Sequence, residues 1–185
     1  MENPIKQKIA IIGLGNIGQI VAKNLVHGNR AVILADRDLG KAKNISEQLG
    51  VLARPMEIGD AFREAEIIIL AVWFNAFKEL FFQYDAVLQN KIIVDPSNPI
   101  APNDKGGFDK IIGKTESAGL LNAAVLPRGA KLVKALGTLG AASLAQAAWQ
   151  KPEPAVLFYA SDDSDIQSEI ESLIHDTGFA PLSVG

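Results

Sequence analysis

The chain has 185 residues, of which 48% are hydrophobic and 21% charged, and its formal net charge of −3 at pH 7 argues against a broad basic surface for nucleic acid. It contains no cysteine and only two histidines, which excludes disulfide frameworks, thiolate catalysis and the common zinc sites. No apolar stretch reaches the roughly 20 residues that span a bilayer, so we expect a cytoplasmic protein with no membrane segment.

Short apolar runs alternate with helical patterns through the first half of the chain. Strands are predicted at residues 9–12, 31–35, 51–53, 67–72 and 91–94. Helices are predicted between them, at residues 17–26, 39–49, 57–65 and 74–88. This alternation is typical of an α/β domain whose mainly parallel sheet is covered by helices on both faces.

The second half of the chain has a less regular pattern. Prolines at 96, 99 and 102, followed by Gly106 and Gly107, predict a long irregular connection after the fifth strand. Further strands are expected at residues 132–136, 155–159 and 179–184, with helices at 141–149 and 161–176. No repeat or linker interrupts the pattern, and we expect residues 1–185 to form a single domain.

The segment Gly13-Leu14-Gly15-Asn16-Ile17-Gly18 lies between the first predicted strand and the first predicted helix. It has the G-x-G-x-x-G pattern of a dinucleotide-binding turn. Gly13 permits the tight turn, Gly15 lets a pyrophosphate approach the backbone, and Gly18 lets helix and strand pack closely. The N–H groups at the start of the helix then face the phosphates. The alternative, a glycine turn that binds nothing, does not require the third glycine. We therefore predict a Rossmann-like, doubly wound, NAD(P)-binding domain.

Charged side chains follow the second predicted strand, where the adenosine ribose of a dinucleotide lies in such folds. Asp36 suits the ribose hydroxyls of NAD(H), whereas Arg37 and Lys41 suit the 2′-phosphate of NADP(H). Asp36 can also rotate outward or pair with Arg37, and Lys41 can equally lie on a solvated helix face. Because exposed charge pairs contribute only about 0.2–1 kcal/mol each, we expect a preference for NADPH of about tenfold or less.

Two further residues follow strands at the same expected edge of the sheet. Trp73 comes after the fourth strand and Asn98 after the fifth, where ligands bind in open α/β sheets. The alternatives are that Trp73 anchors the following helix to the core and that Asn98 forms an ordinary turn.

No residue is well placed as a general acid or base. His27 and His175 fall near the ends of predicted helices, which leaves Lys134 as the remaining candidate. Hydride exchange between a nicotinamide and a flavin-like ring needs positioning but little acid–base help. We therefore assign no catalytic residue and no metal ligand.

Four segments carry a family resemblance. They are the glycine turn at 13–18, Ala71-Val72-Trp73, Val94-Asp95-Pro96-Ser97-Asn98-Pro99, and Val133-Lys134-Ala135-Leu136-Gly137-Thr138-Leu139. In this order they resemble the deazaflavin (coenzyme F-420)-dependent NADP reductases and the nicotinamide-binding domain of the six-transmembrane metalloreductases. The resemblance implies NADP(H) as cofactor, with NAD(H) as the alternative, a flavin or deazaflavin co-substrate, and a homodimer.

The resemblance also implies roles for individual residues. The pyrophosphate would contact Leu14, Gly15, Asn16 and Ile17, and the 2′-phosphate would contact Arg37 and Lys41. The nicotinamide side would be lined by Trp73, Ala135 and Thr138, and Val72 and Asn98 complete the predicted cofactor-binding set. The chain departs from the family at Asp36, which replaces a small hydroxyl residue, and at Val72, which replaces Pro. It also has Gly137 where the family often has a larger polar residue, and the lack of that side chain could widen the second-substrate side.

Two hypotheses of function follow. The first is an oxidoreductase that passes hydride between NAD(P)H and a small-molecule acceptor, which is a flavin-like ring, a deazaflavin or a metal chelate. The second is a non-catalytic NAD(P)-binding module that senses redox state or docks to a partner. The full run of site motifs favours the first hypothesis, and Gly137 favours the second.

Overall fold

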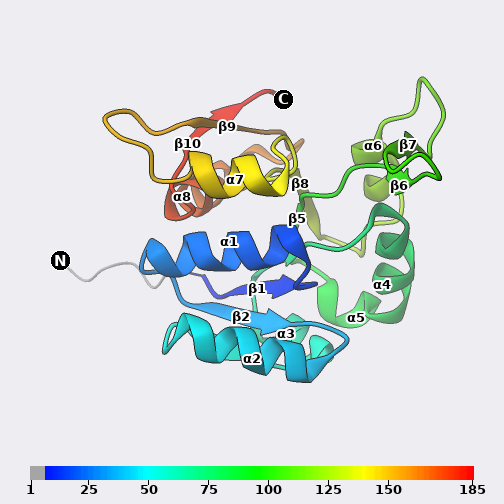
Figure 1. Cartoon of the computed structure of the whole chain (residues 1–185). Coiled ribbons are helices and arrows are strands. Elements are labelled where there is room, and N and C mark those ends of the chain that lie inside the picture. The colour runs from blue at the N-terminus through cyan, green and yellow to red at the C-terminus, as the bar shows by residue number, and fades with distance from the viewer. Residues whose placement is uncertain (1–6) are drawn as a thin grey trace.

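A parallel sheet of six strands forms the centre of the structure, a computed structural model that describes residues 7–185 (Figure 1). The first six residues of the predicted domain lie outside the described residues. The strands are β1 (Ile9–Ile12), β2 (Val32–Ala35), β3 (Ala53–Pro55), β4 (Ile67–Leu70), β5 (Ile92–Asp95) and β8 (Lys131–Lys134). Their order in the sheet is β3-β2-β1-β4-β5-β8, and every neighbouring pair is parallel. The predicted α/β fold is confirmed.

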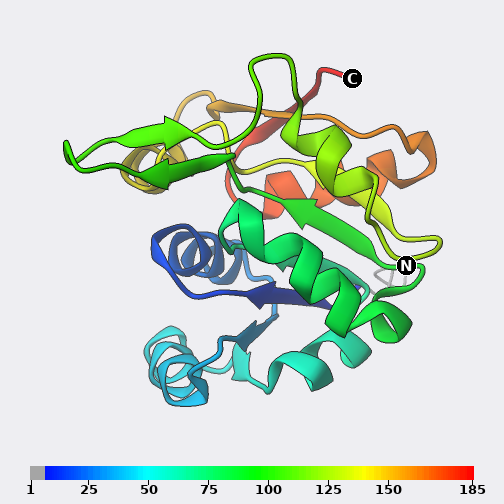
Figure 2. The ribbon, with the colours of Figure 1, turned by 90° about the vertical axis from the view of Figure 1, so that its right-hand side faces the viewer.

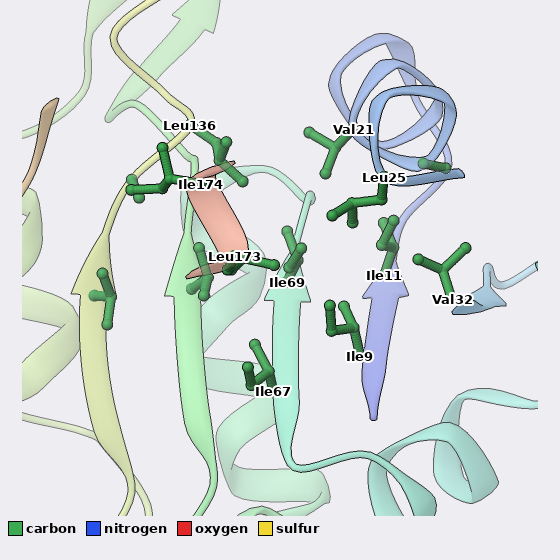
Figure 3. Packing of buried hydrophobic residues seen from close by; sticks show 14 of the residues in the cluster. Ile9, Ile11, Val21, Leu25, Val32, Ile67, Ile69, Leu136, Leu173 and Ile174 are labelled. Atoms are coloured by element: carbon green, nitrogen blue, oxygen red, sulfur yellow. The ribbon is translucent and has the colours of Figure 1, made fainter. Parts of the chain in front are cut away.

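Helices cover both faces of this sheet because successive strand residues point to opposite sides. Ile9 and Ile11 of β1 belong to a buried cluster with side chains of α1 (Asn16–His27), α2 (Leu39–Leu49), α7 (Ala141–Ala147) and α8 (Gln167–Asp176) (Figure 3). Ala10 and Ile12 belong to a second cluster with side chains of α3 (Ile58–Glu64), α4 (Phe77–Gln83) and α5 (Asp85–Leu88). Since both faces are buried, the strands are continuous apolar runs rather than alternating ones.

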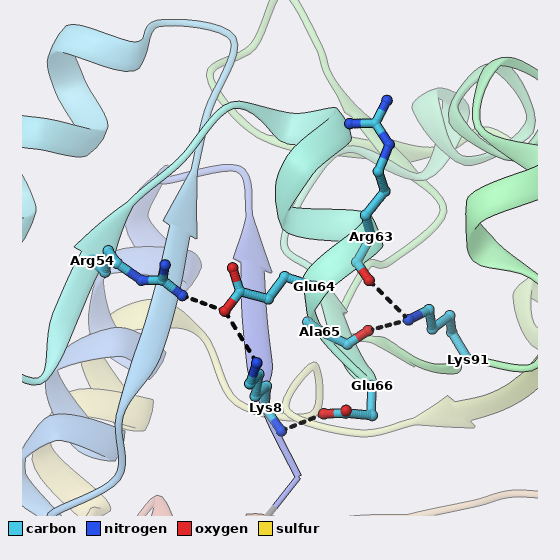
Figure 4. A network of polar contacts seen from close by, with 7 residues as sticks. All are labelled: Lys8, Arg54, Arg63, Glu64, Ala65, Glu66 and Lys91. Carbon is cyan, nitrogen blue, oxygen red and sulfur yellow. Dashed lines mark hydrogen bonds and ion pairs between the residues drawn. The ribbon is translucent and has the colours of Figure 1, made fainter.

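Exposed ion pairs link residues near the amino end of β1, the end of α3 and the edge strand β3 (Figure 4). Oε1 of Glu64 accepts a hydrogen bond from Arg54 at 2.5 Å and lies 3.3 Å from the ammonium of Lys8. Lys91, just before β5, donates to the backbone oxygen of Ala65 at 2.6 Å. The Lys8 and Arg54 side chains are 60% and 55% exposed. The charged groups at this edge of the sheet therefore stay largely hydrated.

The connection after β5 is more regular than the prolines predict, which corrects the expectation of a long irregular segment. It contains an antiparallel hairpin of β6 (Ile100–Pro102) and β7 (Phe108–Lys110), followed by α6 (Ala118–Ala123) (Figure 2). Oδ1 of Asn103 accepts the N–H groups of Lys105 and Gly107 at 3.1 and 2.9 Å, and this side chain shapes the turn. Pro102 is tolerated because it ends a strand of an isolated hairpin, where its missing N–H costs little.

Several predicted element boundaries also change. The helix expected at 74–88 is a 3-10 turn (Phe74–Ala76) followed by α4 and α5, with a break at Tyr84, whose ring packs edge-on against Phe62 at 4.9 Å. The third strand is Ala53–Pro55 rather than 51–53, because Gly50 has φ +81° and starts a turn. Among residues 7–185, no helix is both long and apolar enough to cross a membrane.

The carboxyl-terminal segments form a small second sheet. β9 (Val156–Tyr159) and β10 (Ala180–Ser183) pair in parallel and are joined by a 3-10 turn (Ser164–Ile166) and α8. An antiparallel bridge links this unit to the main sheet, where Lys134 and Ala160 exchange two backbone hydrogen bonds of 2.9 and 3.0 Å. The last residue of β8 is therefore also the attachment point of the small sheet.

Candidate dinucleotide site

The glycine turn lies at the carboxyl end of β1, between that strand and α1. Gly13 has φ +89°, which favours glycine, and a Cβ at this position would lie 2.6 Å from the backbone oxygen of Ala71. A Cβ at Gly18 would collide with the backbone oxygen of Gly13. The packing of the chain itself therefore requires the first and third glycines.

Gly15 is required by neither packing nor conformation. It precedes α1 with φ −71° and ψ −164°, values that other residues adopt readily. Apart from Gly15 and its two chain neighbours, no atom of the described residues lies within 4 Å of the place that a Cβ on Gly15 would occupy. The open space lies beside the first N–H groups of α1, which have no partner within the helix. In dinucleotide-binding turns, a glycine at this point lets a ligand approach the backbone closely.

Asp36, at the end of β2, is bound to the glycine turn. Its Oδ2 accepts the backbone N–H of Leu14 at 2.7 Å and lies 3.6 Å from the ammonium of Lys41, and its Oδ1 accepts the N–H of Asp38 at 3.2 Å. Burial alone would raise the pKa of Asp36, but the two N–H groups and Lys41 outweigh burial and lower this pKa. The alternative in which Asp36 pairs with Arg37 is not observed, and the Leu14 N–H is already occupied by a carboxylate.

A cavity of about 370 Å³ opens beside this carboxylate, and we call it the ribose-side cavity. It is lined by Asp36, Arg37, Glu57, Ile58, Gly59, Asp60, Arg63 and Tyr84. Asp36 is paired with Lys41, and Asp60 with Arg63. Arg37 is exposed, and within residues 7–185 its side chain makes no ion pair or hydrogen bond. Arg37 is therefore the cation that this cavity can offer to a phosphate.

A second cavity, of about 510 Å³, lies where β5 and β8 end, and we call it the acceptor cavity. It brings together Ile17 of the glycine turn with Asn98, Ala135 and Thr138, all of which the sequence placed in the site. Its other lining residues are Pro96, Lys134, Gly137, Leu139 and Gly140. Asn98 donates from Nδ2 to the backbone oxygen of Gly137 at 3.0 Å, so it joins the loops that follow the two strands.

The turn after β8 is strained and tightly packed. Leu136 is fully buried and has φ +65°, a left-handed conformation that is costly for a bulky residue. This conformation ends β8 at Lys134, two residues earlier than predicted. A Cβ at Gly137 would collide with the backbone oxygen of Pro96, so the backbone of the neighbouring loop fills the space of the missing side chain. Gly137 therefore does not widen the cavity in that direction.

Val72 and Trp73 are absent from the lining of these two cavities. A Cβ at Gly13 would lie 2.8 Å from Cγ1 of Val72, which therefore packs under the glycine turn. Trp73 is 56% exposed, and its ring centroid lies 6.4 Å from that of Phe108 on the hairpin. Since the ring is exposed, Trp73 does not anchor the following helix in the core.

A polar cluster at the ends of β5 and β8 was missed by the sequence analysis. Asp95, fully buried, lies 3.0 Å from the ammonium of Lys134 and accepts hydrogen bonds from Nδ2 of Asn122 at 2.8 Å and the N–H of Ser97 at 2.7 Å. Asp95 and Lys134 face each other in the register of the two strands. The available signal was an acidic residue at the end of an otherwise apolar strand.

Comparisons with known proteins agree with this geometry. The family model described as NADP oxidoreductase, coenzyme F420-dependent, matches residues 8–99. The hypothetical protein SMa0349 from Sinorhizobium meliloti has a similar structure, with a TM-score of 0.84, 29% identity, and coverage of 97% of this chain and 85% of that one. A protein from Arthrobacter sp. FB24 assigned as an F420-dependent NADP reductase has a TM-score of 0.81 at 21% identity, covering 97% and 84% of the two chains.

Among curated relatives the similarity is local. A glutamyl-tRNA reductase from Campylobacter jejuni (strain RM1221) is 46% identical over 48 residues, which are 26% of this chain and 11% of that enzyme. The match to the family model includes the glycine turn, Asp36, Arg37 and Asn98. Through residues 8–99, the chain belongs to the family of coenzyme F420-dependent NADP oxidoreductases.

Proposed function

We propose that the protein is an NADP(H)-dependent oxidoreductase. The glycine turn would hold the pyrophosphate of the dinucleotide, the residues of the ribose-side cavity its adenosine ribose, and residues of the acceptor cavity its nicotinamide. The observation that carries the proposal is the open space at Gly15, where only the adjoining residues lie within 4 Å of a Cβ position and the backbone conformation does not call for glycine. A pyrophosphate that approaches the backbone closely supplies the missing reason for this residue.

The residues of the site would have separate roles. The N–H groups of Gly15, Asn16 and Ile17 bind the pyrophosphate at the start of α1. Arg37 binds the 2′-phosphate, since Lys41 is engaged by Asp36. Bound NADPH supplies a hydride, and Ala135 and Thr138 position the nicotinamide beside the acceptor.

The direct test is a titration with NADPH and NADH side by side, followed by intrinsic tryptophan fluorescence or calorimetry. We expect both to bind, with NADPH tighter by about tenfold or less, because Arg37 is an exposed cation beside several carboxylates. Tighter binding of NADH would make Asp36 a ribose ligand. Binding of neither nucleotide would contradict the proposed function.

A second measurement separates the enzyme from a non-catalytic module. Oxidation of NADPH is followed with riboflavin, 5-deazariboflavin or ferric citrate as acceptor, without oxygen. We propose a flavin-like or deazaflavin ring as the acceptor, because the acceptor cavity holds about 510 Å³ next to the expected nicotinamide position. Turnover supports an oxidoreductase, and binding of NADPH without turnover on any acceptor supports a sensing or docking module.

A further inference from the structure

One charged side chain of the acceptor cavity has no role in the proposed binding of the dinucleotide. Lys134 lines this cavity, and its side chain is 30% exposed. Its ammonium lies 3.0 Å from Oδ2 of Asp95 and donates to the backbone oxygen of Ser97 at 2.7 Å. Because an ammonium group carries three N–H donors, these two contacts leave one donor for a ligand.

Asp95 holds the ammonium at this position. Its carboxylate is fully buried, and it also accepts hydrogen bonds from Nδ2 of Asn122 and the N–H of Ser97. A buried carboxylate that loses its cation is strongly destabilised, so Lys134 is kept from swinging into solvent. The pair is neutral overall. The cavity therefore presents a directed hydrogen-bond donor rather than a general attraction for anions.

We propose that Lys134 donates this free hydrogen bond to a carbonyl oxygen of the hydride acceptor, and so selects conjugated ring acceptors whose oxygen gains negative charge on reduction. The inference rests on the proposed function, which supplies NADPH. Lys134 stabilises the oxygen as a hydride with its two electrons leaves NADPH and bonds to the ring. A proton from solvent then neutralises the reduced ring, so that NADPH, the oxidised ring and one proton yield NADP⁺ and the reduced ring.

A purely structural role of Lys134 makes a different prediction. A counter-ion of Asp95 affects the stability of the fold and leaves the rate of hydride transfer alone. A donor that binds more strongly as charge develops on the acceptor lowers kcat more than it changes KM when it is removed. The split between kcat and KM for the acceptor therefore distinguishes the two roles.

The test compares the double variant Asp95→Asn/Lys134→Met with Lys134→Arg and a matched control, Lys131→Met. The double variant removes both charges, so no uncompensated carboxylate stays buried. Lys131 lies on the same strand, is also 30% exposed and pairs with Asp165 outside the cavity. Three quantities are measured: NADPH affinity, riboflavin affinity in the presence of NADP⁺, and kcat and KM for anaerobic reduction of riboflavin by NADPH.

We expect the double variant to bind NADPH within about twofold of the parent and to bind riboflavin about threefold to tenfold more weakly. Its kcat should fall by roughly 30-fold or more, because a donor to the charged oxygen is lost. Lys134→Arg keeps a donor and should retain most of the activity, and Lys131→Met should match the parent.

A double variant that binds NADPH and reduces riboflavin at the parental rate overturns the role of Lys134, and so does a control variant with the same loss. A parent that binds NADPH but neither binds nor reduces riboflavin also overturns it. A parent that binds no NADPH contradicts the proposed function instead.

Discussion

The two edges of the central sheet hold their charges in different ways. At the amino edge, Lys8, Arg54 and Glu64 form exposed pairs, which solvent screens and which contribute little to stability. At the carboxyl edge, Asp95 is completely buried and depends on Lys134 for its counter-charge. A buried ion pair is weak evidence for stability, since apolar residues of similar volume often serve the fold equally well. The comparison is consistent with our proposal that the charge pair at the carboxyl edge serves a ligand rather than the fold.

The largest expected difference between the edges is in the cost of removing one cation. Lys134→Met leaves the Asp95 carboxylate buried without a cation, and we expect the free energy of unfolding to fall by about 3 kcal/mol. Arg54→Met at the amino edge should cost about 1 kcal/mol or less. Urea denaturation of both variants measures the two values. Equal losses would show that the two edges do not differ.

At the glycine turn, we expect a substitution of Gly15 to weaken NADPH binding while the stability of the fold changes little. Gly15→Val adds a Cβ that meets nothing within 4 Å except the adjoining residues, so the free energy of unfolding should change by only about 0.5 kcal/mol. The affinity for NADPH should fall at least tenfold, which is about 1.4 kcal/mol, because the side chain occupies the place of the pyrophosphate. Gly15→Ala should show a smaller loss. Parental affinity in Gly15→Val would mean that the site is assigned wrongly.

A smaller effect is expected at Asp36, where the edge is partly exposed. The pKa of this carboxyl in the folded protein lies below its ordinary value of 3.8, so the charged form stabilises the fold above that pH. This stabilisation is lost as the pH falls through the lowered pKa. Asp36→Asn should therefore be about 1 kcal/mol less stable than the parent at pH 7 and equally stable near pH 2. Urea denaturation across this range provides the test, and a difference that persists at low pH would exclude the charge as its cause.

The smallest expected effect concerns the choice of cofactor. Asp36→Ser removes an anion from the ribose-side cavity and frees Lys41, so the affinity for NADPH should rise while that for NADH stays unchanged or falls. Arg37→Ala should do the reverse. Each change should be about tenfold or less and should shrink at high salt, because the charges are partly exposed. Affinities that move together for both nucleotides would point to a change in the turn rather than in phosphate recognition.

The elements predicted best from the sequence are those whose hydrophobic pattern fits a single type of secondary structure. The run at 9–12 forms a buried strand over those residues, and the helix at 39–49 ends at Leu49 because Gly50 has φ +81°. The hairpin of β6 and β7 was missed because three prolines outweighed the turn signal of Asn103 and Gly106. Prolines limit where a strand can pair, but they do not prevent a short hairpin.

The site was less predictable because its key contacts depend on which side chains meet across the sheet. Asp36 was identified as a candidate from its place after the second predicted strand, but its bond to the Leu14 N–H required the folded positions of both. The pair of Asp95 and Lys134 required the knowledge that β8 lies beside β5. These strands are separated by a hairpin and a helix, and no local pattern specifies their register.

The bridge between Lys134 and Ala160 couples the acceptor cavity to the small sheet of β9 and β10. Both backbone hydrogen bonds of this bridge end on the residue whose side chain lines the cavity. Any shift of the small sheet against the large one must therefore either break these two bonds or carry Lys134 with it. We expect the amide protons of Lys134 and Ala160 to exchange with solvent deuterium at a common rate. If both amide protons exchange more slowly when riboflavin and NADP⁺ are added, then filling the cavity stabilises the hydrogen bonds that join the two sheets.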